Sequence, residues 1–297
     1  MELIHMPEAE YHASSGFGEN QYITRSMIKA YDESPRGFQL RYVDKNPLAQ
    51  FGGNKSTSLG SLTEAVINNT HEQFYCEEPI ERTYPPAKGT AKRDSEEYSQ
   101  YLKNKLDKEN FKKQVEEYTA GREVIKSEEY AKVSLCIDSL NLNGFGNYIL
   151  NTENIEYSPV IRWTDEDTGL RLQVMIDAVV EESILVDYKT GYKQPSKFLS
   201  SAVEYGYDLQ AYLYSKAYYL ATGEELPFVF AYMQTVFPFE ADVIQLNDEI
   251  LEVSRQRVNA ALIGIAEMVS GPECEQSTGA TILEAPEWYT SKFGGEE

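Results

Sequence analysis

Two aspartates and a lysine interrupt an otherwise apolar stretch in the middle of the sequence. Asp177 follows the residues Val-Met-Ile, and ten residues later Asp187 and Lys189 close the run Ser-Ile-Leu-Val-Asp-Tyr-Lys, which begins at residue 183. Polar groups that interrupt apolar strands cost free energy unless they have a partner. If these segments are adjacent antiparallel strands, Asp177 and Asp187 become neighbours. Two carboxylates held together call for a cation between them.

The residue types at these three positions suit hydrolysis of a phosphodiester. Carboxylate oxygens bind Mg²⁺ or Mn²⁺, cations that keep water in their shell and so leave one water available for attack. Lys189 stands two residues beyond Asp187 and therefore points to the same face of a strand. Its ammonium would orient or help deprotonate the water and offset the charge that builds on the phosphorus oxygens. The alternative is a salt bridge at the end of a strand, because a D-x-K tripeptide alone is weak evidence.

Extended and helical patterns alternate around this stretch. Strands are predicted at 154–162, 170–180, 183–189, 227–236 and 241–246, the first two joined by an Asp- and Gly-containing turn at 163–169. Helices are predicted at 22–45, with Thr24 or Ser26 as N-cap and a break at Ser34-Pro35, after the loop at 51–54, from Pro195, and at 207–221 and 247–270. Residues 94–140 combine many Glu and Lys residues with an apolar stripe, which predicts an added helical segment.

The composition is typical of a chain that folds without disulfide bonds. Its 297 residues, 41% of them hydrophobic, suffice for one large domain with a core. The three cysteines lie far apart and form no C-x-x-C pair, so neither a disulfide framework nor a zinc ribbon is indicated. We find no secretory signal and no apolar run long enough for a membrane span, and we expect a soluble, cytoplasmic protein with no membrane partner.

The stretch at residues 174–189 resembles the PD-(D/E)xK nuclease superfamily, in the branch that contains RecB-type nucleases and the exonuclease VIII (RecE-like) group. The residues that carry the resemblance are Asp177, Asp187-Tyr188-Lys189 and Gln210-x-x-x-Tyr214. Further similarities, in order and rough spacing, are Tyr11-His-Ala-Ser, Ser34-Pro35, Leu59-Gly60-Ser61, Trp163-Thr-Asp, Thr168-Gly169-Leu170 and Pro286-x-Trp288. The resemblance covers most of the chain and is weakest between residues 75 and 150.

The resemblance implies a restriction-endonuclease-like α/β (α+β) fold, a mixed β-sheet flanked by helices, here with the added helical segment. It implies Mg²⁺- or Mn²⁺-dependent hydrolysis of phosphodiester bonds in linear duplex DNA, by an exonuclease of phage or bacterial recombination. It also implies a homo-oligomer, commonly a ring that digests duplex ends from 5′ to 3′, beside a strand-annealing recombinase. We therefore expect one nuclease-like domain over residues 1–270, with the helical insertion at about 94–140, followed by a C-terminal arm at 271–297.

The same resemblance assigns roles to individual residues. Asp177, Asp187 and the main-chain carbonyl of Tyr188 would bind the metal, Lys189 would serve the water, and Gln210 and Tyr214 would support the phosphate or the DNA strand. Gln210 and Tyr214 are four residues apart, so on a helix they share one face, about 6 Å apart along the axis. Tyr214 could equally belong to an ordinary packed aromatic helix, because three further tyrosines lie nearby.

The sequence departs from the family pattern at Glu64. Many members of the branch have a histidine in the helix after the Gly-Ser or Gly-Thr turn, where this chain has a glutamate. A glutamate there would give the metal a third carboxylate, as in other branches of the superfamily. The alternative is a solvated charge on the surface of a helix.

The net charge of -21 motivates a second hypothesis. Phosphate attraction normally comes from a surplus of Lys and Arg, so an acidic chain argues against simple electrostatic binding to DNA. The charge is uneven: residues 88–113 contain eight Lys or Arg against five acids, whereas the last 27 residues contain six acids and one lysine. A basic groove can exist locally. The alternative is an inactive nuclease-fold protein that binds DNA, or imitates DNA and inhibits another protein.

Overall fold

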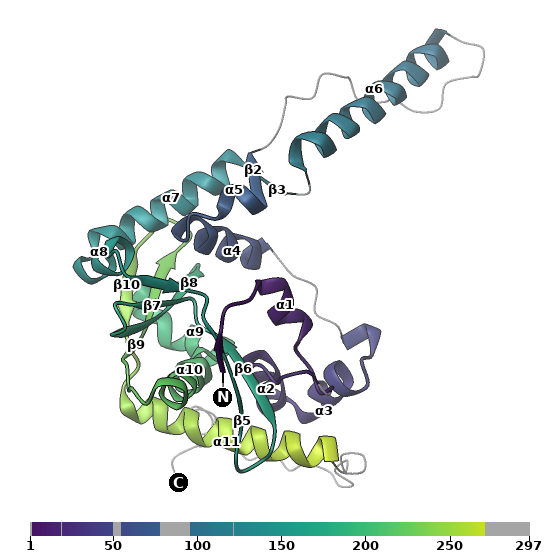
Figure 1. Ribbon diagram of the computed structural model, residues 1–297. Helices are drawn as coiled ribbons and strands as arrows, with labels where there is room; N and C mark the ends of the chain where they lie inside the picture. Colours follow the sequence, from purple (N-terminus) through teal and green to yellow (C-terminus); the bar gives the residue numbers. More distant parts are fainter. Residues whose placement is uncertain (1, 19, 50–54, 78–95, 121, 271–297) are drawn as a thin grey trace, which may run out of the picture.

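A computed structural model describes residues 2–18, 20–49, 55–77, 96–120 and 122–270 (Figure 1). Over these residues the chain has a mixed α+β fold, with a five-stranded mixed sheet and a three-stranded antiparallel sheet flanked by helices. The predicted C-terminal arm lies outside the described residues, as does the loop at 51–54. Among the described helices, none is long and apolar enough to cross a membrane.

The five-stranded sheet has the strand order β10-β9-β8-β7-β4. Its strands are β4 (Ile155–Tyr157), β7 (Ala178–Val180), β8 (Ile184–Gly191), β9 (Phe228–Gln234) and β10 (Ala241–Ile244). β8 and β9 are parallel and the other pairs are antiparallel. The connection from β8 to β9 contains the 3-10 turn η3 (Pro195–Lys197), α9 (Phe198–Tyr205) and α10 (Tyr207–Thr222). A parallel pair needs such a crossover, because a tight turn can join only antiparallel strands.

Strand β8 contributes side chains to two separate apolar layers. Leu185 packs with α10 and the N-terminal helix α2 (Arg25–Glu33) in the larger core cluster, which extends from Ile23 to Ile265. Val186 and Tyr188 face the opposite layer, where they pack with α7 (Ser127–Leu142) and α8 (Gly144–Asn151). This alternation follows from the period of two along a strand. It leaves the odd-numbered positions 187 and 189 on the side of α10.

The three-stranded sheet has the order β1-β5-β6, with β1 (Glu2–Ile4), β5 (Val160–Thr164) and β6 (Arg171–Met175). In Figure 1 it lies near α1 (Glu8–Ala13) and α2. The N-terminal region also contains α3 (Pro35–Phe38), the π-helix η1 (Gln39–Val43), the 3-10 helix η2 (Pro47–Ala49), α4 (Lys55–Ile67) and α5 (His71–Phe74), and α4 packs on β8 and α7. Thr24 precedes α2 without a side-chain cap, whereas the hydroxyl of Ser34 accepts a hydrogen bond from Gly37 N and so starts α3. The predicted break at Ser34-Pro35 is present.

The prediction of two continuous strands at 154–162 and 170–180 was wrong. Each segment is divided between the two sheets, β4 and β5 in the first case and β6 and β7 in the second. Ser158 has a left-handed backbone, with φ of 54°, and the proline that follows it has no N–H for a ladder. At this double break Ser158 N donates to Asp177 O at 3.0 Å. Asp177 therefore lies at the crossing between two sheets, and not inside a strand.

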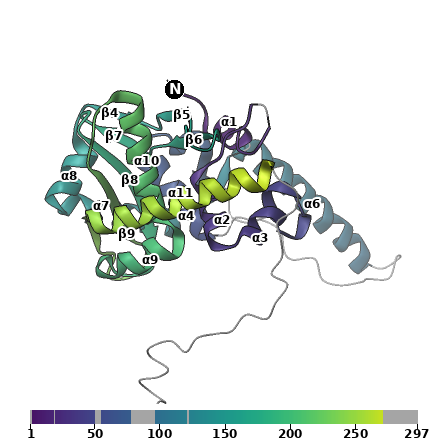
Figure 2. The same cartoon turned by 90° about the horizontal axis from the view of Figure 1, so that it is seen from below.

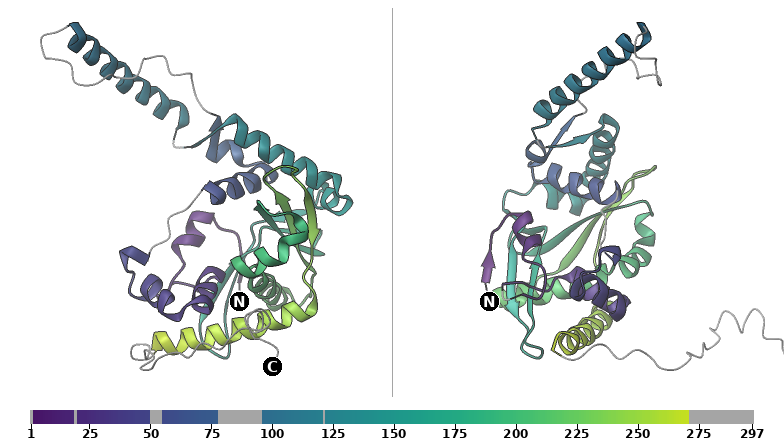
Figure 3. Two further views of the ribbon diagram at one scale, coloured as in Figure 1. Left: turned by 180° about the vertical axis from the view of Figure 1, so that it is seen from behind. Right: turned by 90° about the vertical axis from the view of Figure 1, so that its right-hand side faces the viewer.

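The prediction of one helical segment at 94–140 was also incomplete. The region contains α6 (Glu96–Thr119), the short strand β3 (Glu123–Ile125) and the first part of α7. β3 pairs in parallel with β2 (Tyr75–Glu77), because its Val-Ile pair suits a strand, and Ala120 adopts φ of 47° just before it. A new helix starts after Lys126, whose N–H donates to the Glu129 side chain. Helix α6 extends away from both sheets (Figure 3).

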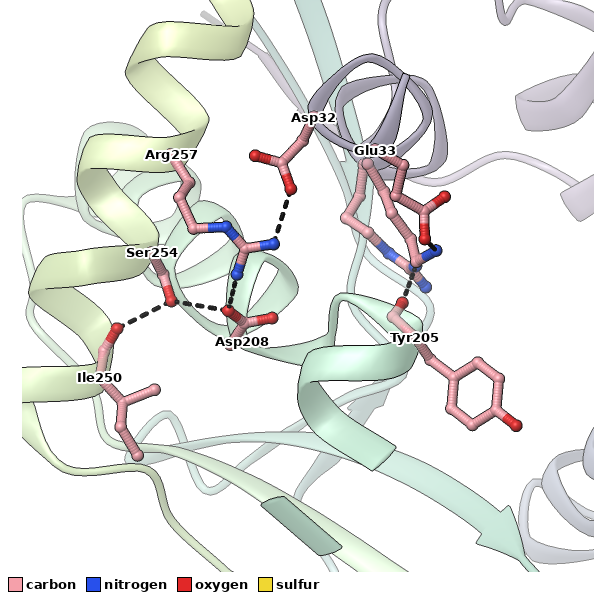
Figure 4. A network of polar contacts seen from close by, with 9 residues as sticks. Asp32, Glu33, Tyr205, Asp208, Ile250, Ser254 and Arg257 are labelled. Atoms are coloured by element: carbon pink, nitrogen blue, oxygen red, sulfur yellow. Dashed lines mark hydrogen bonds and ion pairs between the residues drawn. The ribbon is translucent and has the colours of Figure 1, made fainter. Parts of the chain in front are cut away.

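The last described helix, α11 (Asp248–Ser270), packs against α10 and α2 (Figure 2). The guanidinium of Arg257 on α11 forms ion pairs with Asp208 on α10 and with Asp32 on α2, the latter at 2.6 Å (Figure 4). Ser254 donates a hydrogen bond to the backbone of the same helix and contacts Asp208 at 3.4 Å. This polar network joins three helices beneath the larger core, and two of them also carry residues of the cavity described next.

Candidate active site

The pairing of β7 with β8 places Asp177 opposite Asp187. Ala178 is the register partner of Val186, and one step further along the same antiparallel ladder brings residues 177 and 187 together. The N–H of Tyr188 donates to Asp177 Oδ2 at 2.8 Å, which fixes the carboxylate at the end of the ladder. The predicted proximity of the two aspartates is therefore present, although Asp177 itself lies just before the strand.

Lys189 points to the same side of β8 as Asp187, as the strand period predicts. Its ammonium forms an ion pair with Asp187 Oδ2, and the two side chains are 15% and 0% exposed. The carboxyl group of Asp187 is thus wholly buried, while the lysine reaches the surface of a cavity. This contact is also the salt bridge of the alternative interpretation, so the ion pair alone does not decide between the two.

Helix α10 contributes the two residues of the Gln-x-x-x-Tyr pattern. Gln210 Nε2 donates a hydrogen bond to Asp187 Oδ1, and Gln210 is 3% exposed. Tyr214 is buried on the same helix face, lines the cavity and packs edge-on against Phe228, with 6.1 Å between the ring centroids. Gln210 therefore orients a carboxylate, whereas Tyr214 both packs in the core and borders the cavity.

Glu64 reaches the same cavity from α4. This helix packs on β8. Burial raises the pKa of Glu64 to about 7, and the carboxylates of Glu8 and Asp187 act in the same direction while Lys189 opposes them. The alternative of a solvated helix charge does not describe this residue, because the half-buried side chain borders the cavity beside other carboxylates.

Repulsion within this group also affects Asp177. Burial raises its pKa well above the ordinary value, and the neighbouring carboxylates of Asp187 and Glu64 raise the pKa further. Lys189 and the N–H of Tyr188 act in the opposite direction. Three carboxylates therefore face one lysine, and an added cation would relieve the excess of negative charge.

The cavity that these residues share has a volume of about 1010 Å³ and is bordered by α1, α2, α4, β8 and α10. All the predicted site residues line it: Glu64, Asp177, Asp187, Tyr188, Lys189, Gln210 and Tyr214. Arg25, at the first position of α2, is a second cation in the wall. Glu8 and His12 of α1 also line the cavity, hydrogen-bonded to each other at 3.2 Å.

The donor set suits a hard divalent cation. Asp177 and Asp187 offer carboxylate oxygens, and among the described residues Asp187 Oδ2 accepts no well-directed hydrogen bond beside its ion pair. The N–H and C=O of a strand residue point to the same edge, so the carbonyl of Tyr188 faces the Asp177 side of β8. Within the described residues, however, no three His, Cys, Asp or Glu side chains already form a ready metal site. Two carboxylates and one carbonyl fit Mg²⁺ or Mn²⁺.

The prediction from the sequence did not include Glu8, His12 and Arg25 of the cavity lining, or Tyr207, which contacts Lys189. The ring centroid of Tyr207 lies 5.0 Å from Lys189 Nζ. The available signal was helical spacing, because Tyr207, Gln210 and Tyr214 stand at positions i, i+3 and i+7 of one helix. Arg25 gave no comparable signal. Glu156 of β4 pairs with His5 at 3.0 Å.

A comparison with protein families decides how this geometry is to be classified. Residues 96–281 match the family described as a PDDEXK-like domain of unknown function (DUF3799), and this range is more than half of the chain. The chain belongs to this family. The predicted superfamily is thereby confirmed, and the match begins after Glu64. A PDDEXK-like domain supports a nuclease-type, hydrolytic function with DNA as substrate, and PDDEXK-like nucleases generally depend on a divalent metal.

A solved structure shows the same fold. A "Putative exonuclease" from Eubacterium rectale is 13% identical in sequence, with a TM-score of 0.56 over 99% of this chain and 100% of the other. The predicted mixed sheet flanked by helices is therefore confirmed for the PDDEXK-like chain. A structure of SSO0001 is 16% identical, with a TM-score of 0.27 over 45% of this chain and 63% of the other. No curated protein matches the sequence.

Proposed function

We propose that the protein is a divalent-metal-dependent exonuclease that hydrolyses phosphodiester bonds of linear duplex DNA. The observation that carries this proposal is the convergence of Asp177, Asp187 and Lys189 on one large cavity, two carboxylates for a metal beside one ammonium for a phosphate. A salt bridge that served stability alone would have no need of the additional carboxylates of Asp177 and Glu64. The repulsion among these carboxylates destabilises the fold, and a bound cation would remove that repulsion.

Each residue would have a separate task. A bound Mg²⁺ or Mn²⁺ would polarise the phosphate and make a coordinated water more acidic. The N–H of Tyr188 holds Asp177 through Oδ2, so Asp177 keeps Oδ1 for the cation. Gln210 holds Asp187 through Oδ1, and Asp187 would offer Oδ2, the oxygen that pairs with Lys189 in this structure. Lys189 would orient the attacking water and stabilise the charge that develops on the phosphate oxygens.

Arg25 extends the cationic side of the cavity in a protein that is acidic overall. Its guanidinium donates to the backbone carbonyl of Tyr205 at 3.1 Å, a neutral partner, and no carboxylate among the described residues forms an ion pair with it. Arg25 would help to bind the phosphate group on which Lys189 acts. Carboxylates outnumber these two cations in the cavity lining, so attraction of a phosphate would also require the charge of the bound divalent cation.

The decisive experiment is incubation of linear duplex DNA with purified protein and Mg²⁺ or Mn²⁺. We expect loss of the substrate with wild type and no loss with Lys189→Ala, and we expect a closed circular duplex of the same sequence to survive. The matched control is Lys216→Ala, because Lys216 also pairs with an aspartate, Asp165 at 3.3 Å, outside the cavity. If wild-type protein leaves linear DNA intact with both metals, the proposal fails.

The ion pair between Lys189 and Asp187, together with the charge of -21, favours a second candidate, a nuclease-fold protein that binds or imitates DNA without cleaving it. Metal binding separates the two. An enzyme requires that Asp177→Asn weakens the affinity for Mn²⁺, as measured by calorimetry, whereas an inactive interaction protein has no such requirement. We therefore expect measurable Mn²⁺ binding to wild type and at least a tenfold weaker affinity in the variant.

The finer parts of the proposed function follow from the resemblance. We propose a homo-oligomer, a strand-annealing recombinase as partner, and a place in recombination in the cytoplasm of a bacterial or phage-infected cell. We also propose that residues 1–270 form one nuclease domain and that Glu64 is a third carboxylate for the metal. Light scattering of the purified protein tests the oligomer, and a monomer at micromolar concentration would contradict it.

A further inference from the structure

The ammonium of Lys189 has two neighbours of different kinds. One is the carboxylate of Asp187, and the other is the face of the Tyr207 ring, whose centroid is 5.0 Å from Nζ. This distance lies within the range of a cation–π interaction, which strengthens when the cation is shielded from water. Lys189 is only 15% exposed, so the shielding condition is met.

The Tyr207 ring is held in place by other aromatic rings. It stacks on Phe198, with 6.0 Å between centroids and 20° between planes, and contacts Phe230 and Tyr205 at 6.0 and 5.7 Å. No described residue forms a hydrogen bond with its hydroxyl group that would explain a tyrosine at this position. The face of the ring, and not its polar end, is therefore the part that meets the lysine.

Once a divalent cation binds to Asp187, the attraction between the Asp187 carboxylate and the Lys189 ammonium weakens, whereas the attraction of the Tyr207 ring remains. A carboxylate that ligates a cation loses much of its attraction for a nearby ammonium, because the cation repels the ammonium. The ring carries no net charge and is not a ligand for Mg²⁺. Since this argument needs the metal site, it rests on the proposed function.

We propose that Tyr207 is a positioning residue that holds Lys189 in the cavity through its ring face when Asp187 binds the metal. The corner before it has a matching role. Gly206 adopts φ of 67°, a left-handed conformation that ends α9 and starts α10, and the carbonyl of Tyr205 just before it accepts a hydrogen bond from Arg25. One corner of the chain, Tyr205–Tyr207, thus touches both cations of the cavity.

The first test compares two substitutions at one position. We expect Tyr207→Leu to lower kcat on linear duplex DNA by about fivefold or more, with KM within about twofold of wild type, because the lysine acts on the reacting phosphate and not on substrate capture. We expect Tyr207→Phe, which keeps the ring face, to restore most of the lost kcat. Tyr219→Leu, at an exposed tyrosine of the same helix, is the control for loss of a tyrosine from α10.

The second test does not depend on cleavage. With ¹³C-labelled lysine, the Lys189 side-chain signal, assigned with Lys189→Arg, should show an upfield ring-current shift in wild type and Tyr207→Phe and lose it in Tyr207→Leu. The shift should persist when Mg²⁺ is added. If Tyr207→Leu does not fold, Tyr207→Met replaces it.

An unchanged Lys189 signal in the leucine or methionine variant would overturn the proposal, as would a phenylalanine variant with the same loss of kcat as the leucine variant. If wild type cleaves no DNA at all, the proposed function fails, and the NMR result still decides whether the ring holds the lysine.

Discussion

Removal of one carboxylate from the cavity should make the metal-free protein more stable. The pKa of Glu64 is raised from 4.5 to about 7, mainly by burial. A raised pKa means that the folded state binds the proton more tightly than the unfolded state, so stability falls as the pH rises from 4.5 through 7. At about 1.4 kcal/mol per pKa unit, the ionised side chain costs the fold about 3 kcal/mol at pH 8. Glu64→Gln cannot ionise and avoids this cost.

The assay is thermal unfolding in EDTA at pH 5 and at pH 8. At pH 5 the carboxyl group of Glu64 is mostly protonated in the folded protein, so wild type and Glu64→Gln should melt at similar temperatures. At pH 8 the variant should melt higher, by roughly 5–10 °C for a chain of this size. Addition of Mn²⁺ should reverse the order, because the added cation stabilises the wild-type carboxylates by mass action.

The matched control is Glu267→Gln, at an exposed glutamate of α11. It should shift the melting temperature by no more than a degree or two at either pH, since surface charges away from special features matter little. If Glu64→Gln in EDTA is no more stable than wild type at pH 8, the repulsion within the cavity has been overstated, and with it the physical case for a cation there.

Three further substitutions test the supports of the site. Gln210→Leu removes the hydrogen bond to buried Asp187 and should cost about 1–3 kcal/mol of unfolding free energy in denaturant melts and lower kcat on duplex DNA about tenfold; unchanged values of both would contradict the orienting role. Gly206→Ala should lower the melting temperature more than Gly223→Ala does, although both glycines are left-handed. Only at Gly206 would an added Cβ crowd a lysine side chain, at 2.9 Å. Thermal unfolding of the two variants measures the difference. Arg257→Leu leaves buried Asp208 of α10 unpaired and should lower the free energy of unfolding by about 3 kcal/mol in urea titrations. The control Arg255→Leu, at an exposed arginine, should lower it by under about 1 kcal/mol.

The sequence predicted that Asp177, Asp187 and Lys189 lie together, because strand geometry is local. The period of two placed Lys189 beside Asp187, and the turn after residue 180 placed Asp177 opposite Asp187. The spacing of Gln210 and Tyr214 placed both on one face of α10. In each case a short-range rule was sufficient, since the residues concerned lie on one element or on two consecutive ones.

The division of the strands could not be predicted in this way. Whether β4 joins β7 or continues into β5 depends on which sheet has room for it, and this is a property of the tertiary structure. Pro159, with no N–H for a ladder, was a local sign of the break, although it did not indicate that the chain changes sheets. Similarly, β3 exists because β2, about 50 residues earlier, offers a partner strand.

The residues missed at the site have the same explanation. Arg25 enters the cavity because α2 packs on α10 and α11, an arrangement secured by Arg257 and its two aspartates. Nothing within ten residues of Arg25 in the sequence reports that packing. Tyr207 shares a helix face with Gln210, so helical spacing could have indicated that it lies near Lys189.

The alternation of side chains along β8 makes the alignment of one strand pair decisive for the whole molecule. A slip of a single residue against β9 would turn the Tyr188 side chain toward α10, and it would turn Asp187 and Lys189 into the apolar layer that packs on α7 and α8. Seven consecutive partners, from Leu185 to Gly191, guard against this error. A substitution that weakens the pairing of β9 with β8 should therefore abolish activity while most of the protein remains folded. The position of the site residues depends on a row of backbone hydrogen bonds that does not contact the substrate.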